Sequence, residues 1–353
     1  MTLRINATGL VKLFLERYQH WCDHQNFYVG SHPPQIIDDP LGIPCFHYRD
    51  IDNINACSDT VVAIDCVPEG INNAHRFKKY NPNKHYIIFS NGRWDQDAFQ
   101  LNIKYTLINN LYFLFDYADM YLSPNRFNFY LDKDYQFDYP KQNNFMSTVG
   151  NVRAERTYFV DQMVKKCSYK NFVLRYSGED FGMPSNQFDV INFSKGEFDP
   201  YTPITPILEQ HNHTVSHSLP IKMYNTAYFN VVVETDIDYN NEFFMTEKTV
   251  KALITGIPFV VVSTPNFLKN LKSLGFLTYD NFWDESYDAE IDYKTRIDKI
   301  VELCNNLGSF DWAKHRTELE TIKLRNRNNF MNLNWLASQE FQEFENKIKD
   351  IPQ

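Results

Sequence analysis

The sequence lacks the features that would place it in several common protein classes. Its six cysteines are scattered without a C-x-x-C pair, which argues against a disulfide framework or a zinc site and favours reduced thiols. No apolar run approaches the roughly 18 residues of a membrane span, and residues 1–21 predict an amphipathic helix rather than a signal peptide. We therefore expect a cytoplasmic protein with no membrane span.

An excess of positive charge is also missing. The formal net charge of -9 argues against a uniformly basic surface that coats nucleic acid, although one groove can still carry positive charge locally. The composition, 43% hydrophobic and 22% charged, is typical of a folded protein, and 353 residues suffice for two domains of ordinary size. Aromatic residues make up 16% of the chain, enough to fill a core and to line a ligand pocket.

The first half of the chain contains short runs that predict buried strands. Residues 60–67 and 85–92 are β-branched and aromatic and end at turn residues. Residues 100–122 have helical spacing followed by a strand-like end. The polar, proline-containing stretch 132–144 then predicts a link between two domains.

In the second half, strands alternate with helices, and this order predicts a parallel sheet covered on both faces. The expected strands are 145–149, 170–177, 228–235 and 257–263, and the expected helices are 151–167, 246–256, 264–275 and 292–307. We expect an N-terminal acceptor-side domain over 1–140 and a donor-binding domain over 145–330. A C-terminal helical tail, 331–353, is expected to pack back on the first domain.

An adjacent acid and base, Glu247 and Lys248, open one of these helices. Thr246 is a good N-cap for this helix and Gly256 a good C-terminal stop. A lysine in the first turn is unfavourable for the helix alone, but it would contact a phosphate bound at the free N–H groups there. The neighbouring carboxylate could accept hydrogen bonds from ribose hydroxyls. The alternative is a surface salt bridge or a glutamate that compensates the helix dipole.

Residues 228–288, which contain "VVVETD" and "FFMTEKTVKALITGIPFVVVS", resemble the donor-binding domain of fucosyltransferase-like glycosyltransferases with the GT-B fold. The stretch "FMSTVGNVRAERTYFVDQMVKK" is similar to the strand, turn and arginine-bearing helix of the same domain, so the resemblance covers about 145–288. It implies an α/β protein with two Rossmann-like domains facing a cleft. The implied activity is a hexosyl- or pentosyltransferase that uses a nucleotide sugar and no divalent metal or other cofactor.

The resemblance also assigns roles by position. Glu247 would bind the donor ribose, Lys248 would bind the diphosphate, and Arg153 or Arg156 would neutralise the same diphosphate as the sugar departs. The remaining donor-side residues are Thr246, which opens the helix, Glu234 near the transferred sugar, and Tyr224 and Asn225 in the same pocket. The related sequences also share the segment Asp284–Asp288, for which we expect a partly structural role.

The chain departs from the fucosyltransferases after Glu234, where it has Thr235 and the insertion "DIDYNN". The transferred sugar is therefore not specified by the resemblance. The N-terminal half shows no resemblance that would identify the acceptor.

An inverting transfer needs a general base for the acceptor hydroxyl, and we expect this base on the first domain. The candidates are Asp65 and Glu69, which lie in or after a predicted strand, and Asp95. Each of them could equally be an ordinary loop carboxylate. A retaining transfer needs no such base, and the sequence does not decide between the two stereochemical outcomes.

Two patterns suggest a metal site only weakly. The D-x-D triplet Asp236–Asp238 is expected by chance in a chain with 44 acidic residues. His211, His213 and His217 alternate as strand residues would, but no carboxylate or cysteine nearby completes a ligand set. We expect no metal site.

Two other functions stay open. The first reading expects a glycan or a lipid-linked saccharide as the acceptor. The acceptor could instead be modified DNA, as in phage glycosyltransferases that act on hydroxymethylated bases, with a basic cleft from Arg76, Lys78, Lys79, Lys84 and Arg93. The chain could instead be a non-catalytic module that binds a sugar or nucleotide.

Overall fold

The computed structural model describes residues 5–6, 43–47, 50–66, 77–94, 101–111, 114–115, 134–149, 153–168, 172–176, 221–238, 242–349 and 351. The chain divides into two compact units, each containing a parallel sheet. Unit 1 comprises Met1–Asp119, Asn241–Phe244 and Asn332–Gln353, and unit 2 comprises Met120–Asn240 and Met245–Met331. The fold is therefore mixed α/β, and the two units are described separately below.

Unit 1 contains a five-stranded sheet whose strands are all parallel and whose spatial order is β1-β2-β3-β4-β6. Its strands are β1 (Ile5–Asn6), β2 (Ile43–His47), β3 (Val61–Cys66), β4 (His85–Asn91) and β6 (Lys104–Asn110). Helix α2 (Ile51–Ala56) supplies Ile54 to a core cluster that includes Val62, Tyr86 and Leu107. A short antiparallel pair, β5 (Arg93–Trp94) and β10 (Glu242–Phe243), completes the described strands of this unit.

The final helix, α12 (Asn334–Lys349), returns to unit 1 and packs on β6. The carboxylate of Glu340 accepts a hydrogen bond from the backbone N–H of Leu111 at 3.2 Å, and Lys347 donates to the carbonyl of Leu107 at 3.0 Å. Polar groups of α12 thus bond β6 and the residue that follows it. Across the described part of the chain, no helix combines the length and the apolar character needed to cross a bilayer.

Unit 2 contains a four-stranded parallel sheet with the spatial order β11-β9-β7-β8. Its strands are β7 (Asn143–Val149), β8 (Phe172–Tyr176), β9 (Ala227–Val233) and β11 (Phe259–Val262). The side chains of β9 and β11 are almost entirely buried, as their continuous runs of valine and phenylalanine predict for strands covered on both faces. The chain moves to one side of β7 to form β8 and then to the other side to form β9 and β11.

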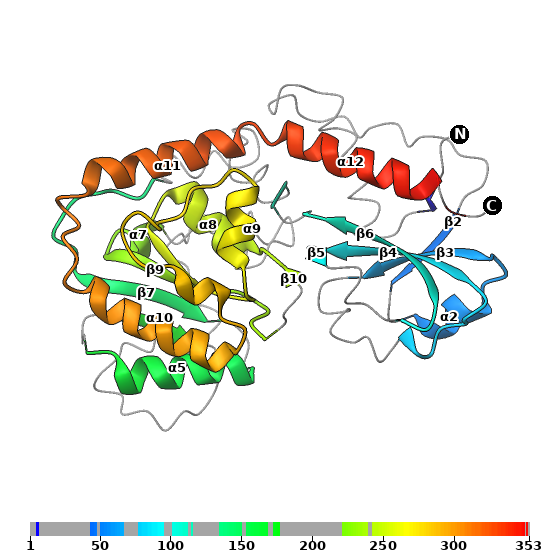
Figure 1. Ribbon diagram of the computed structural model, residues 1–353, viewed down its shortest axis with the longest axis horizontal. Helices are drawn as coiled ribbons and strands as arrows, with labels where there is room; N and C mark the ends of the chain where they lie inside the picture. Colours follow the sequence, from blue (N-terminus) through cyan, green and yellow to red (C-terminus); the bar gives the residue numbers. More distant parts are fainter. Residues whose placement is uncertain are drawn as a thin grey trace, which may run out of the picture. The chain divides into compact units, whose positions relative to one another are not determined.

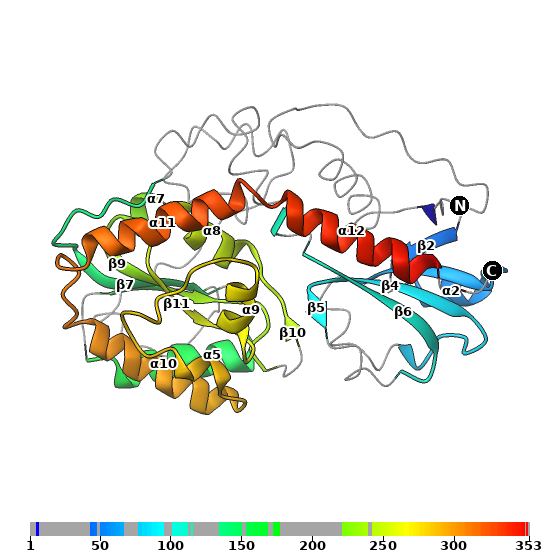
Figure 2. The ribbon, with the colours of Figure 1, turned by 45° about the horizontal axis from the view of Figure 1, so that its top comes forward.

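The helices of unit 2 cover both faces of this sheet (Figures 1 and 2). Helices α5 (Ala154–Lys166) and α10 (Tyr293–Leu307) pack together on one face. Helices α8 (Glu247–Thr255) and α11 (Arg316–Phe330) pack together on the other. The helices that follow β7 and β9 therefore leave the sheet toward opposite faces, as right-handed crossovers in opposite directions require.

Helix α8 begins and ends as its sequence predicts. Thr246 is the N-cap, with a side chain that accepts from the backbone N–H of Lys248, and Gly256 is the C-cap in the left-handed region at φ 78°. A Cβ on Gly256 would lie 2.2 Å from Cγ of Lys323 on α11. Glycine is needed here both for the backbone conformation and for the close approach of α11.

The structure differs from the sequence-based expectations in several elements. Residues Ile5–Asn6, within the helix expected over 1–21, form strand β1, and strand β2 and helix α2 were not predicted. Residues 104–110 form strand β6 and not the expected helix, because their β-branched and aromatic residues pair in register with β4. Helix α11 was not predicted, since its apolar positions are few and its contact with α8 depends on tertiary structure. The other strands and helices expected in the second half are present, with boundaries shifted by a few residues.

Candidate functional site

The sheet of unit 2 has a topological switch point between β7 and β9. The next strand in the chain after β7 lies on one side of it, whereas β9 and β11 lie on the other. In open α/β sheets, ligands bind beyond the carboxyl ends of the strands at such a point, where helices leave toward opposite faces. The residues that follow β7 and β9 here include Arg153, the N-cap of α5, and Glu234.

Glu234 directly follows β9, and its fully buried carboxylate reaches the N-terminus of α8. Its oxygens accept hydrogen bonds from the backbone N–H groups of Thr246 and Thr249, both at 3.2 Å, and from the hydroxyls of the same two threonines. An anion in this place offsets the partial positive charge of the helix terminus. Glu234 therefore connects the end of β9 to the first turn of α8.

The first turn of α8 is consequently closed by the protein itself. Two of its N–H groups bond Glu234, and the N–H of Lys248 bonds the hydroxyl of Thr246 at 3.4 Å. The expectation that these groups are free to hold a diphosphate is wrong, because a carboxylate from the preceding strand already occupies them. An anionic ligand at this edge would have to bind side chains.

Two cations from different helices meet at Thr235. Arg153 donates to the carbonyl of Thr235 at 3.2 Å and to Oδ1 of Asp236 at 2.9 Å. Nζ of Lys248 lies 3.4 Å from the hydroxyl of Thr235, 3.1 Å from that of Thr246 and 3.0 Å from a carboxylate oxygen of Glu247. The side chains of Arg153 and Lys248 are 30% and 20% exposed, so both are fixed by protein contacts and still reach the surface.

Two further cations lie deeper at the same edge. Arg156 is 3% exposed and donates to the carbonyl of Glu234 at 3.0 Å; burial and then the nearby Arg153 lower its pKa. Burial lowers the pKa of Lys251 to about 8, against the attraction of Glu247. For Glu247, burial alone would raise the pKa, but Lys248 and Lys251 together lower it.

The described side chains at this edge carry charges of both signs. Four cations, Arg153, Arg156, Lys248 and Lys251, lie with the carboxylates of Glu234, Asp236 and Glu247, and Asp238 and Glu155 follow on the same two segments. The partly exposed groups of Arg153 and Lys248 suit a small anion such as a diphosphate.

No family model, curated protein or solved structure matches the chain. The resemblance to glycosyltransferase donor-binding domains therefore rests on the residues of the chain alone.

Tyr224 and Asn225 do not join the other predicted donor-side residues. Tyr224 is buried at the end of α7 (Ile221–Tyr224), and Asn225 accepts a hydrogen bond from the backbone N–H of Gln136 at 2.8 Å. Both residues precede β9, whereas Glu234 follows it. The seven residues of the strand separate the two groups by roughly 20 Å, so they do not line the same site.

The candidate bases belong to unit 1. Asp65 is the last residue but one of β3, where its backbone lies between His47 of β2 and Phe89 of β4. Glu69 and Asp95 lie outside the described residues. All three stay predictions.

The sequence did not predict four residues at this edge as parts of the site: Thr235, Asp236, Thr249 and Lys251. Thr235 and Asp236 could have been found, because they continue the polar run that begins at the carboxyl end of a buried valine strand. Lys251 lies four residues after Glu247, a spacing that places both on one face of a helix. Nothing in the sequence indicated that Thr249 would bond a carboxylate 15 residues earlier.

The segment Asp284–Asp288 is structural, in line with the expectation for part of it. Glu285 accepts from the hydroxyl of Thr278 at 2.7 Å and from the N–H of Tyr279 at 2.8 Å. Asp288 accepts from the first turn of α9 (Phe267–Ser273) through the N–H groups of Leu268 and Lys269. These acids hold loops and a helix terminus in place.

The structure can also be compared with the weaker sequence patterns, the possible metal ligands and the basic cleft. In the described part of the chain, no group of three histidine, cysteine or acidic side chains is arranged to hold a metal ion. Asp236, from the D-x-D triplet, pairs with Arg153, and the three histidines at 211, 213 and 217 lie outside the described residues. Lys84, proposed for a basic cleft, is buried and donates to the carbonyls of Cys57 and Asp59.

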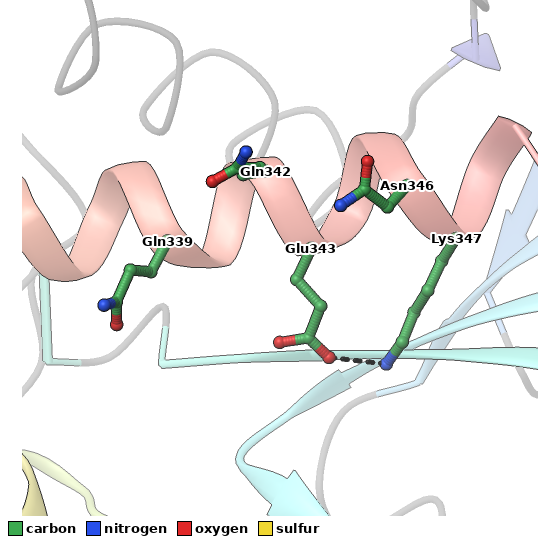
Figure 3. Close-up of a pocket in the computed structure, with 5 residues that line it drawn as sticks. All are labelled: Gln339, Gln342, Glu343, Asn346 and Lys347. Atoms are coloured by element: carbon green, nitrogen blue, oxygen red, sulfur yellow. Dashed lines mark ion pairs between the residues drawn. The ribbon is translucent and has the colours of Figure 1, made fainter.

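A hollow of about 330 Å³ lies along α12 in unit 1 (Figure 3). Its described lining comes from this one helix: Gln339, Gln342, Glu343, Asn346 and Lys347. The single ion pair among them, between Lys347 and Glu343 at 2.7 Å, joins side chains one helical turn apart. The hollow offers a polar helix face without convergent groups from a second element.

Proposed function

We propose that the chain is a metal-independent glycosyltransferase that moves a sugar from a nucleotide-sugar donor to an acceptor hydroxyl. The observation that supports this most strongly is the meeting of Arg153 and Lys248 at Thr235, beyond the carboxyl end of β9. The two α/β units would be two Rossmann-like domains facing a cleft, with the donor on unit 2. Unit 1 would carry the acceptor and, in an inverting enzyme, the base.

The proposed chemistry follows from where charge develops. As the glycosidic bond to the donor breaks, negative charge grows on the leaving diphosphate, and preorganised cations stabilise that charge. Arg153 and Lys248 would perform this role because both are fixed by protein contacts before the ligand arrives. Glu247, whose side chain is 17% exposed, would accept hydrogen bonds from the ribose hydroxyls.

The role proposed for Glu234 changes with the structure. Its carboxylate is buried and bonds four donors of Thr246 and Thr249, so contact with the transferred sugar is not favoured. We propose instead that Glu234 is a positioning residue. It fixes the first turn of α8 and thereby the backbone that carries Glu247 and Lys248.

The proposal is tested by thermal unfolding of the protein with a panel of nucleoside diphosphates and sugar nucleotides, followed by a search for nucleotide release by chromatography. We expect at least one nucleoside diphosphate to raise the Tm by several degrees, since ligand at 100 times its Kd contributes about 2.7 kcal/mol to stability. We also expect release of that nucleotide from one of its sugar conjugates when acceptor or water is present.

The outcomes separate the candidate functions. If no nucleotide raises the Tm, the proposed donor site is contradicted. A shift without transfer or hydrolysis would favour the non-catalytic binding module. Binding to duplex DNA that weakens steeply with added salt would favour a DNA acceptor.

A further inference from the structure

Arg296, near the start of α10, is an arginine held almost entirely by main-chain carbonyls. Its side chain is 1% exposed, which makes it one of the largest fully buried side chains. Nε donates to the carbonyl of Ser263 at 2.9 Å, and Nη2 donates to that of Ile237. Nη1 donates to the carbonyls of Glu290 and Ile291, the latter at 3.1 Å.

These four carbonyls come from three separate parts of the chain. Ile237 belongs to the segment that follows β9, Ser263 follows β11, and residues 290–291 precede α10. The planar guanidinium presents five N–H donors in a fixed fork, so one side chain can bond all three segments in one geometry. Arg296 thus joins the ends of two neighbouring strands to the beginning of α10.

A buried guanidinium costs free energy unless other groups compensate it. Burial lowers the pKa of Arg296, and the acids that oppose this effect, Asp238 first, act at a distance and form no ion pair with it. The compensation comes from carbonyl dipoles. A purely apolar side chain would fill the same volume without this cost, so a buried arginine is favoured where the positions of those carbonyls must be fixed.

The segment fixed by Arg296 is the one that carries the candidate site. Four consecutive residues after β9 each have a different connection: Glu234 bonds α8, Thr235 meets Lys248, Asp236 pairs with Arg153, and Ile237 bonds Arg296. Displacement of the carbonyl of Ile237 would therefore move the acceptors that orient Arg153. It would also move the hydroxyl beside Lys248.

We propose that Arg296 is a positioning residue for the anion site, because it holds Glu234–Ile237 in the geometry that brings Arg153 and Lys248 together. The inference rests on the proposed function, since the anion is the diphosphate of the donor. Arg296 itself is too deeply buried to contact that ligand. Its effect is transmitted by the backbone of the segment.

The test uses the full chain and three variants. Arg296→Lys keeps the charge but loses the fork, and Arg296→Met keeps much of the volume without charge. Leu303→Ala, in the same helix two turns later, is the matched control, because it also removes buried contacts but leaves the bond of Arg296 to the segment in place. Affinity for the nucleoside diphosphate that binds wild type is measured by calorimetry at a temperature where all variants are folded.

We expect both Arg296 variants to lose at least tenfold in affinity and Leu303→Ala to bind like wild type, even where the three lose similar stability. If the Arg296 variants also bind like wild type, the residue serves stability alone and the inference is overturned. Equal losses in all three variants would overturn it as well, because the effect would then be a general loosening of unit 2.

Hydrogen exchange keeps this test separate from that of the proposed function. The N–H of Glu234 bonds the carbonyl of Val262 at 2.9 Å and should exchange slowly in wild type. We expect faster exchange across 234–237 in Arg296→Lys than in Leu303→Ala. If wild type binds no nucleotide, the proposed function fails, and hydrogen exchange alone decides whether Arg296 fixes the segment. Equal exchange in Arg296→Lys and Leu303→Ala would contradict that role of Arg296.

Discussion

Helices α8 and α9 differ in what surrounds their first turns, although both turns bond a carboxylate from elsewhere in the chain. At α8 the carboxylate is Glu234, which accepts from two N–H groups and two hydroxyls. At α9 it is Asp288, which accepts from two N–H groups alone, at 2.8 and 3.0 Å. The chain thus neutralises both helix termini by itself.

The difference lies in the neighbouring cations. Arg153 and Lys248 lie beside the α8 carboxylate and are partly exposed. Of the two cations that act on Asp288, Lys272 is partly exposed and pairs with Asp280 and Glu285, whereas Arg296 is buried and bonds carbonyls. Both cations at α8 are partly exposed, but only one of these two is. A helix N-terminus therefore does not by itself mark a ligand site in this fold. Partly exposed cations from two elements mark it.

The largest expected effect distinguishes the two carboxylates. Glu234→Ala should lower the free energy of unfolding by about 3–5 kcal/mol, because it leaves four buried donors without their acceptor and removes the negative charge near the buried Arg156. Asp288→Ala should cost about 1–2 kcal/mol, the usual cost of a lost helix cap. Urea unfolding measures both. A larger loss for Asp288→Ala would contradict the special role given to the α8 carboxylate.

A second prediction concerns the buried Lys251 beside the α8 site. Its pKa of about 8 when folded lies below 10.5, the value expected when unfolded. Below pH 8 both states carry the charge and the folded protein bears the full cost of burying it. Between pH 8 and 10.5 the folded state has lost the proton that the unfolded chain retains, so stability rises with pH.

Lys251→Met should therefore be more stable than wild type at pH 7, by up to about 3 kcal/mol, and this difference should shrink as the pH approaches 10.5. Urea unfolding from pH 7 to 10 checks the trend. Lys165→Met is the control, because Lys165 is a largely exposed lysine of α5 and should give a constant difference. If the stability difference between Lys251→Met and wild type stays constant over this pH range, burial of the Lys251 charge does not destabilise the folded protein.

The smallest expected effect concerns the hydroxyl of Thr235, which lies 3.4 Å from Nζ of Lys248. Thr235→Val removes the hydroxyl beside Lys248 and should weaken nucleoside diphosphate binding about fivefold, the equivalent of one hydrogen bond. Thr235→Ser keeps the hydroxyl and should bind within twofold of wild type. Calorimetry measures the affinity of both variants for the nucleoside diphosphate. Equal affinities of Thr235→Val and Thr235→Ser would show that Thr235 is not part of the site.

Much of unit 2 could be predicted from the sequence because its elements carry strong local signals. The valine runs of β9 and β11 and the Thr246–Gly256 caps of α8 specify strands and a helix without help from distant residues. Strand β6 was misread because apolar residues three and four apart also occur in a strand buried on both faces. Only pairing with β4 decides between these alternatives.

The candidate site could be predicted in part. The resemblance and the helix signals indicated Arg153, Glu247 and Lys248, whose side chains lie at one edge of the sheet. The role of Glu234 could not be predicted, because it depends on a carboxylate folding back on a helix 12 residues later. The position of Tyr224 at the far end of β9 follows from strand direction and length.

The most direct test of the account is a calorimetric titration of a nucleoside diphosphate into wild type, Arg153→Ala, Lys248→Ala and Lys165→Ala. Lys165 is the matched control, since it is a lysine of the same unit that also forms one ion pair, at 2.8 Å. We predict that Arg153→Ala and Lys248→Ala each lose about 10- to 100-fold in affinity, as expected for one charged hydrogen bond, while Lys165→Ala binds like wild type. Wild-type affinity in Arg153→Ala and Lys248→Ala would contradict the claim that these two cations form the donor site.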